Sequence, residues 1–113
     1  MKSKPILALD FDGTLHAYTG WNDGVMNGPV PGALMFVERA MKYFTVVVVS
    51  SRCNDAGGSG DIACWLEKYG FPPLKVSADR PPAFVSLDDR ALTFNGTWPS
   101  VEELRKFMPW WKR

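Results

Sequence analysis

The residues Thr45–Val49 form an unbroken β-branched run, TVVVV. Such residues favour a strand, and the lack of polar residues between them indicates a strand that is covered on both faces. Strands of this kind are typical of parallel sheets, whose faces are covered by helices. This run therefore predicts the centre of an α/β fold.

The segments around this run alternate between strand and helix patterns. Pro5–Leu9 predicts a first buried strand, and apolar residues at helical spacing from Leu34 to Phe44 predict a helix. A second helix is expected to begin with Asp61 as its N-cap, after a flexible loop at Ala56–Gly60. The alternation predicts a parallel sheet with helices on both faces.

The second half of the chain predicts shorter elements. Leu74–Ser77 is expected to be a short strand, Ala83–Leu87 a buried strand and Ala91–Phe94 an edge strand. Ser100 and Glu103 match a capping box, so a last helix is expected to begin there.

Length and composition place this chain among single globular domains. The 113 residues, 46% of them hydrophobic, are enough for one core, and we expect one domain over 1–113. A net charge of +1 indicates no global attraction to nucleic acid or anionic membranes. No segment approaches the ~20 apolar residues of a membrane span, and the start resembles no signal peptide, so we expect a cytoplasmic protein. Cys53 and Cys64 are expected to be ordinary reduced residues, and no obligate protein partner is indicated.

Polar residues follow three of the expected strands at the point where each strand ends. These pairs are Asp10 with Asp12, Ser50 with Ser51, and Asp88 with Asp89. Because the carboxyl ends of parallel strands meet along one edge of a sheet, these side chains are expected to lie together.

Carboxylates gathered in this way repel one another unless a cation lies among them. Mg²⁺ prefers oxygen ligands and takes one or two carboxylates together with a substrate phosphate. We expect Asp10, Asp88 and the backbone carbonyl of Asp12 to bind Mg²⁺, with Asp89 as a supporting acid. Ser50, or Ser51 as the alternative, would then hold a phosphoryl oxygen.

The two acids of the first pair acquire separate roles in phosphoryl transfer. Asp10 is expected to be the nucleophile that forms an aspartyl-phosphate, and Asp12 the general acid and then base. Gly13 would let the chain turn so that both carboxylates reach the substrate. A basic side chain is still needed to offset the developing phosphoryl charge.

The order of these motifs resembles the haloacid dehalogenase superfamily of phosphohydrolases. The match consists of Asp-x-Asp-Gly-Thr at Asp10–Thr14, the strand-end Ser50, a basic residue, and the acidic pair Asp88–Asp89. The resemblance implies a Rossmann-like three-layer α/β/α sandwich, a magnesium cofactor, and hydrolysis of a phosphomonoester through Asp10. Neither insertion between the motifs has room for a cap domain.

The basic residue implied by the resemblance has two candidates, Arg80 and Lys75. Arg80 precedes Pro81 where the signature of the family has lysine, and its planar guanidinium spreads the charge that lysine concentrates. The implied phosphate-binding set therefore consists of Thr14, Ser50, Ser51, Lys75 and Arg80. The alternative function is a phosphate- or metal-binding module with little or no catalysis.

The chain looks most like small capless members from phages and bacteria, some related to the 3′-phosphatase half of polynucleotide kinases. Nucleic-acid ends or another large phosphorylated molecule are the substrates that this resemblance implies. His16 is read either as a substrate contact or as an exposed flap residue, and Arg52 either as a second phosphate ligand or as a solvated side chain. Trp110 and Trp111 are expected to lie over the core. A signalling receiver domain is a third reading, which the motif order disfavours.

Overall fold

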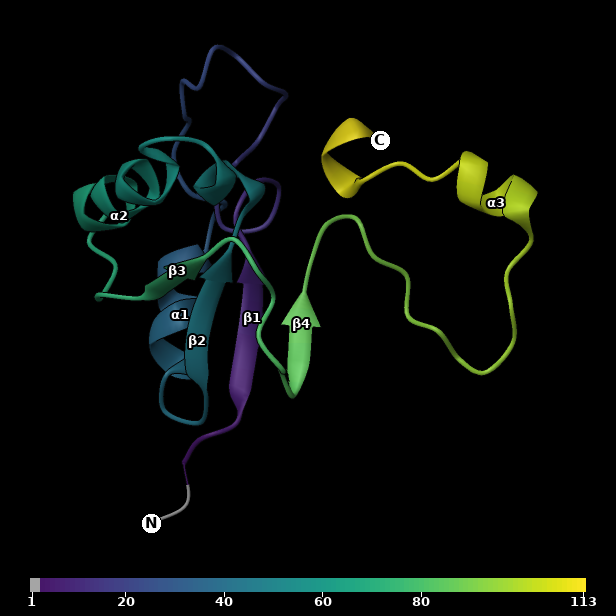
Figure 1. The fold of residues 1–113 in the computed structure, drawn as a ribbon, viewed down its shortest axis with the longest axis horizontal. Helices are drawn as coiled ribbons and strands as arrows, with labels where there is room; N and C mark the ends of the chain where they lie inside the picture. The colour runs from purple at the N-terminus through teal and green to yellow at the C-terminus, as the bar shows by residue number, and fades with distance from the viewer. Residues whose placement is uncertain (1–2) are drawn as a thin grey trace.

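A computed structural model describes residues 3–113, which contain a four-stranded sheet in the order β3-β2-β1-β4 (Figure 1). The strands are β1 (Ile6–Asp10), β2 (Thr45–Val49), β3 (Lys75–Ser77) and β4 (Val85–Leu87). Every pairing in this sheet is parallel. The α/β class and the parallel sheet predicted from the sequence are therefore confirmed.

Helices and short 3₁₀ turns connect or follow these strands. They are α1 (Ala33–Ala40), η1 (Ser51–Asn54), α2 (Gly58–Lys68), α3 (Val101–Arg105) and η2 (Trp110–Lys112). None of the helices within residues 3–113 has both the length and the apolar character that crossing a bilayer requires.

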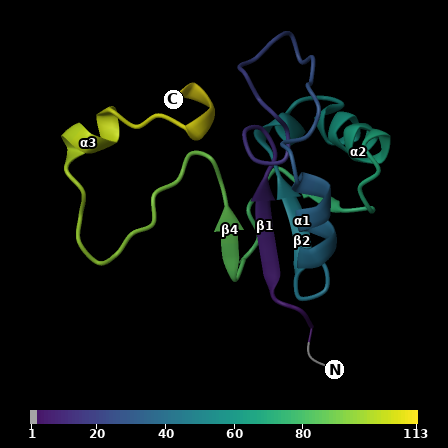
Figure 2. The same ribbon diagram turned by 180° about the vertical axis from the view of Figure 1, so that it is seen from behind.

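The core lies against one face of the two central strands. Leu7 and Leu9 of β1 and Val46 and Val48 of β2 alternate with residues of the opposite face, and all four belong to one buried cluster. The same cluster contains Val37 of α1 and Ile62, Trp65 and Leu66 of α2. Figure 2 shows α1 in front of the sheet when the molecule is seen from behind.

Both long helices therefore share one core, whereas the connection from β3 to β4, residues 78–84, contains no helix. A three-layer sandwich with helices on both faces is not confirmed in the part of the chain that the structure describes.

The start of α2 differs from the prediction. The helix begins at Gly58 with Gly57 as its N-cap, so Asp61 lies in the first turn and the expected loop at Ala56–Gly60 is partly helical. Gly57 has φ 80°, a left-handed conformation that favours glycine. A Cβ at Gly58 would overlap the backbone carbonyl oxygen of Arg52. These glycines therefore allow α2 to approach η1, and they do not mark a flexible loop.

The region after β3 also differs from the prediction. β4 has two exposed residues and one half-buried residue, so the expected buried strand is wrong. The reason is that β4 lies at the edge of the sheet and pairs only with β1, and its side chains Val85 and Leu87 stay exposed there. Ala91–Phe94 forms no strand. The helix expected after Ser100 is confirmed, and the Ser100 hydroxyl accepts a hydrogen bond from the Glu103 backbone N–H.

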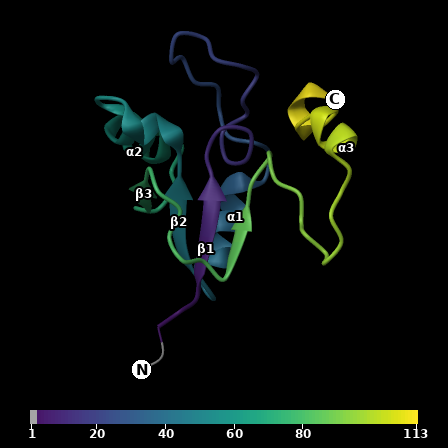
Figure 3. The ribbon, with the colours of Figure 1, turned by 45° about the vertical axis from the view of Figure 1, so that its right-hand side comes forward.

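The segment that follows β4 extends away from the sheet before it returns. Residues 91–106 are all exposed, and Figure 3 shows this segment passing through α3 and turning back toward η2. The radius of gyration is 15.0 Å, compared with about 13 Å for a compact domain of 100 residues. The outward excursion accounts for this difference.

Candidate active site

A cavity of about 280 Å³ lies at the carboxyl ends of the strands, where the chain leaves β1, β2 and β4. The strands β2 and β4 flank β1, and ligands of open parallel sheets bind in crevices at the carboxyl ends of the strands. All three strand-end pairs predicted from the sequence meet here. The lining residues are Asp10, Asp12, Tyr18, Ser50, Ser51, Asp88, Asp89 and Arg90.

Three carboxylates in this cavity lie close together. Asp10, Asp88 and Asp89 each offer one oxygen, and these oxygens lie within 4.8 Å of one another. Burial raises the pKa of Asp10 to about 8, and a hydrogen bond with Asp89 and the negative charges of Asp88, Asp89 and Asp12 contribute to the increase. A folded protein without a cation therefore holds a proton at this position at neutral pH.

This donor set suits a hard divalent cation. All of its ligand atoms are carboxylate oxygens, which Mg²⁺ prefers, and no nitrogen or sulfur ligand belongs to the group. Asp10 and Asp88, predicted as metal ligands, are both members, and so is Asp89, which was predicted as a supporting acid. The side chain of Asp12 is outside the group.

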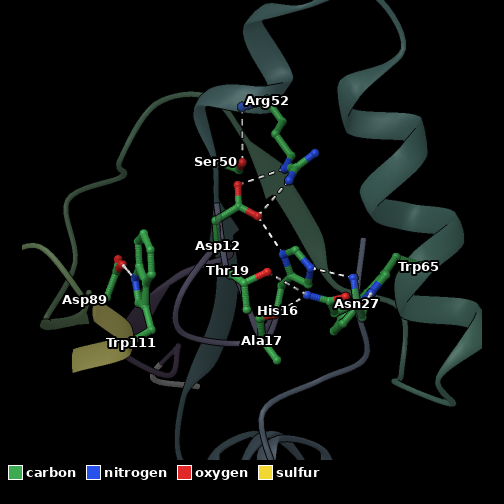
Figure 4. Close-up of polar contacts among 10 residues, drawn as sticks. All are labelled: Asp12, His16, Ala17, Thr19, Asn27, Ser50, Arg52, Trp65, Asp89 and Trp111. Carbon is green, nitrogen blue, oxygen red and sulfur yellow. Dashed lines mark hydrogen bonds and ion pairs between the residues drawn. The ribbon is translucent and has the colours of Figure 1, made fainter. Parts of the chain in front are cut away.

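The Asp12 carboxylate is instead held by two side chains that approach from the other side. Arg52 donates from Nε to Asp12 Oδ2 at 2.8 Å and from its terminal nitrogen to Asp12 Oδ1 at 3.0 Å. His16 Nδ1 lies 2.7 Å from Asp12 Oδ1 (Figure 4). Both oxygens of Asp12 therefore have partners in the folded protein.

The tautomer of His16 follows from its second ring nitrogen. The backbone N–H of Asn27 donates to His16 Nε2 at 2.8 Å, so this nitrogen carries a lone pair and no proton. The proton of a neutral imidazole must then be on Nδ1, where it is donated to Asp12. His16 is only 2% exposed, and it stacks against the buried ring of Phe11.

This arrangement determines the protonation state of Asp12. Burial alone would raise its pKa, but the hydrogen bonds from His16 and Arg52 and the charge of Arg52 outweigh burial and lower it. Asp12 is consequently a carboxylate at neutral pH, whereas Asp10, two residues earlier, holds a proton in the absence of a cation.

One of the two interpretations that the sequence left open for each of Arg52 and His16 was wrong, and the other, a contact with substrate or phosphate, stays a prediction. Neither side chain is solvated or in an exposed flap, because both are buried against Asp12. A lone histidine four residues after the first acid pair and an arginine directly after the serine pair were the available signals. Neither spacing distinguishes an internal ligand of Asp12 from a substrate contact.

The short turn after β1 brings His16 back to Asp12. The backbone N–H groups of Thr14 and His16 both donate to the carbonyl of Phe11, and Gly13 has φ 86°. This turn requires glycine at its left-handed position. Phe11 is fully buried and contacts Trp65 of α2 edge to face at 4.9 Å, which fixes the turn against the core.

The two serines lie at the end of β2, as predicted. Ser50 is buried, and its hydroxyl accepts a hydrogen bond from the Arg52 backbone N–H at 3.1 Å, which begins η1. Ser51 is exposed, and both residues line the cavity. Their roles as phosphate ligands stay predictions.

The two candidates for the basic residue have different positions. Arg80 forms an ion pair with Asp88 at 3.0 Å and lines a small adjoining cavity together with Asp10. Lys75 is the first residue of β3, is exposed, and does not line either cavity. Thr14 lines a separate cavity beside Leu9 and Pro31. The structure therefore brings Arg80 to the acidic cluster, and not Lys75 or Thr14.

Three aromatic or basic residues of the site edge were not predicted as site residues. Tyr18 and Arg90 line the cavity, and the indole N–H of Trp111 donates to Asp89 Oδ2 at 2.7 Å. A local sequence pattern does not indicate that Trp111 reaches Asp89, because the contact joins separate segments of the chain.

Comparison of the chain with protein-family models, with curated proteins and with solved structures finds no match.

Proposed function

We propose that this protein is a magnesium-dependent phosphomonoester hydrolase that acts through an aspartyl-phosphate on Asp10. The observation that carries the proposal is the meeting of Asp10, Asp88 and Asp89 in one cavity with Ser50 and Ser51. Carboxylates that can hold a hard cation, beside hydroxyls that can bind phosphoryl oxygens, are the groups that this reaction needs. The Rossmann-like three-layer fold and the relation to the haloacid dehalogenase superfamily belong to the same proposal.

In this proposal Asp10 attacks the phosphorus and displaces the alcohol. A bound magnesium ion would offset the negative charges of the carboxylates and of the phosphate. Water then hydrolyses the aspartyl-phosphate, and the phosphate leaves. Ser50 and Ser51 would donate hydrogen bonds to phosphoryl oxygens, and Arg80 would add positive charge beside Asp88.

Asp12 would transfer protons in both steps. Its lowered pKa suits the second step, in which a carboxylate takes a proton from the attacking water. In the first step Asp12 must protonate the leaving oxygen, and the negative charge of an arriving phosphate would raise the pKa of Asp12 toward that role. Arg52 and His16 would hold the carboxylate in place and fix its orientation.

Phosphorylated nucleic-acid ends are the substrates that we propose to test first. The cavity is bordered by Tyr18 and Arg90, a ring and a guanidinium that can contact a base and a second phosphate. The assay compares a small aryl phosphate with oligonucleotides phosphorylated at the 3′ or the 5′ end, with and without Mg²⁺.

The variant Asp10→Asn tests the mechanism. Loss of the nucleophile is expected to reduce turnover by about a thousandfold or more, whereas Asp61→Asn, an exposed acid of α2, should leave turnover unchanged. Absence of magnesium-dependent phosphate release from every substrate, or equal release by Asp10→Asn, would contradict the proposal.

A phosphate- or metal-binding module without turnover is the second candidate. The ion pair of Arg80 with Asp88 favours it, because this pairing uses the basic side chain that would otherwise contact phosphate. Fluorine NMR with beryllium fluoride distinguishes the two functions. An adduct that forms on wild-type protein and is absent from Asp10→Asn supports acyl-phosphate chemistry, and its absence from both supports the binding module.

A further inference from the structure

The 3₁₀ turn η2 and the preceding Pro109, here called the tryptophan turn (residues 109–112), contact the edge of the acidic cavity. The indole N–H of Trp110 donates to the Gly13 carbonyl at 2.7 Å. The indole N–H of Trp111 donates to Asp89 Oδ2 at 2.7 Å, as Figure 4 shows. Pro109 is buried, although residues 91–106 are all exposed. The tryptophan turn is therefore docked, unlike the chain that leads to it.

The ring of Trp111 is held by residues of the cavity edge. Tyr18 contacts it edge to face with 5.0 Å between ring centroids, and the Arg90 guanidinium lies 5.4 Å from it. Tyr18 and Arg90 both line the cavity that contains Asp89. Trp111 is therefore fixed by aromatic and cation–π contacts as well as by its hydrogen bond.

Gly13 connects the tryptophan turn to the first acid motif. A Cβ at this position would overlap Asp89 Oδ2 and lie 2.7 Å from Trp111 Nε1. The absence of a side chain at Gly13 thus gives the hydrogen bond between Trp111 and Asp89 the space that it occupies.

We propose that Trp111 is a positioning residue for Asp89, and that docking of the tryptophan turn and binding of a divalent cation strengthen each other. The inference rests on the proposed function, since it takes Asp10, Asp88 and Asp89 as the cation site. The indole N–H uses one lone pair of Oδ2, and the carboxylate has further lone pairs with which it could bind a cation. The same hydrogen bond limits rotation of the carboxylate.

The linkage is reciprocal. If the docked tryptophan turn increases the affinity for the cation, the cation must stabilise the docked turn by the same factor. Partners of metal-binding carboxylates typically change metal affinity by about 10- to 100-fold. The opposite arrangement, in which the indole competes with the cation for Asp89, would give an effect of the opposite sign.

Trp111→Phe tests the positioning role because it keeps an aromatic ring beside Tyr18 and removes the N–H donor, and the control variant below loses the same atoms. Calorimetric titration with Mg²⁺, and with Mn²⁺ as a second probe, is expected to show about tenfold weaker binding than in wild-type protein. Trp98→Phe is the matched control, since Trp98 is 83% exposed and contacts Phe94 instead of the cavity. Unchanged or tighter binding by Trp111→Phe overturns the proposal.

Indole NMR of protein with ¹⁵N-labelled tryptophan gives a readout that does not depend on activity. The Trp111 signal, assigned by its loss in Trp111→Phe, is expected to exchange slowly with solvent and to exchange more slowly when Mg²⁺ is added. Faster exchange with Mg²⁺ overturns the proposal. If Trp111→Phe does not fold, the effect of Mg²⁺ on the wild-type signal, identified by its change in Asp89→Ala, still tests it.

The two readouts separate failure of this inference from failure of the proposed function. Mg²⁺ binding that is equal in wild-type protein and Trp111→Phe, and that is lost in Asp10→Asn, keeps the cation site and rejects the positioning role. No Mg²⁺ binding by wild-type protein rejects both.

Discussion

At the scale of single residues, the contacts of the Asp12 carboxylate join three segments of the chain. It follows β1, its guanidinium partner Arg52 comes from η1, and its imidazole partner His16 comes from the turn after β1. Each partner is buried, so the energy of each contact is less reduced by solvent than that of a surface ion pair. Removal of one partner would leave charge uncompensated in a part-buried place, so the intact network matters for stability as well as for the orientation of Asp12.

Replacing Arg52 should reveal that contribution. Arg52→Lys keeps a positive charge but loses the paired N–H donors, and we expect the free energy of unfolding to fall by about 1.5 to 3 kcal/mol. Urea unfolding measures the change. Arg39→Lys, at an exposed position of α1, is the control and should stay within about 0.5 kcal/mol of wild-type protein. A loss no larger than that of the control would show that Arg52 does not stabilise Asp12.

The protonation of Asp10 predicts how stability depends on pH in the absence of metal. The pKa of Asp10 is about 8 in the folded protein and about 3.8 in an unfolded chain. Between these values the folded state holds a proton that the unfolded state releases, so this group makes stability fall as pH rises from about 5 to 8.

Urea midpoints at pH 5 and pH 8 with a chelator present test this sign. Asp10→Asn should lose less stability than wild-type protein over that interval, because its side chain does not titrate. Added Mg²⁺ should recover stability at pH 8, since it binds the ionised form. A wild-type protein whose stability rises more steeply with pH than that of Asp10→Asn would contradict the raised pKa.

Two glycines of α2 give opposite predictions at the scale of secondary structure. A Cβ at Gly58 would overlap the Arg52 carbonyl oxygen, whereas a Cβ at Gly60 meets nothing within 4 Å. We expect Gly58→Ala to lower the free energy of unfolding by about 1 to 3 kcal/mol, and Gly60→Ala to raise it by about 0.5 to 1 kcal/mol. Both changes are measured by urea unfolding. Equal effects would mean that α2 does not depend on its close approach to η1.

The sequence predicted those elements whose pattern is complete within a few residues. Thr45–Val49 and Pro5–Leu9 identified β2 and β1 because continuous apolar strands are buried in a parallel sheet. Ala83–Leu87 has a similar pattern, but β4 lies at an edge where exposure depends on what covers it. The prediction of a flexible loop at Ala56–Gly60 failed for a similar reason. Glycine is needed at position 58 because the carbonyl of Arg52, a residue of η1, lies too close for a Cβ, and a local pattern does not show this contact.

The site was predictable to the same extent. Asp10, Ser50 and Asp88 lie at one edge because each ends or follows a parallel strand, and parallel strands end together. The partners of Asp12 and Asp89 were harder to predict. Arg52 and Trp111 reach them through tertiary contacts that leave no local spacing, and the four-residue spacing from Asp12 to His16 does not distinguish a partner of Asp12 from a substrate contact. Arg80 rather than Lys75 is near the cluster because Lys75 begins its strand and Arg80 follows it.

At the scale of the whole molecule, the exposed segment after β4 should be the first to be cut by a protease. Arg90, Arg105 and Lys106 are exposed, whereas Arg52 is buried. Brief digestion with trypsin is expected to cleave after one or more of the exposed three, several-fold faster than after Arg52. Mass spectrometry identifies the fragments. A first cut between β1 and β3 would contradict the exposure of this segment.

The contact between Trp110 and Gly13 has a consequence for the order in which the molecule assembles. It joins residues separated by 97 positions, whereas β1 and β2 pair residues 39 positions apart, such as Ile6 and Thr45. Closing the longer loop costs more chain entropy, and one hydrogen bond returns little of it unless the sheet already holds Gly13 in place. The strands should therefore pair before the cavity acquires its full edge, and mutations in the tryptophan turn should accelerate unfolding more than they slow folding.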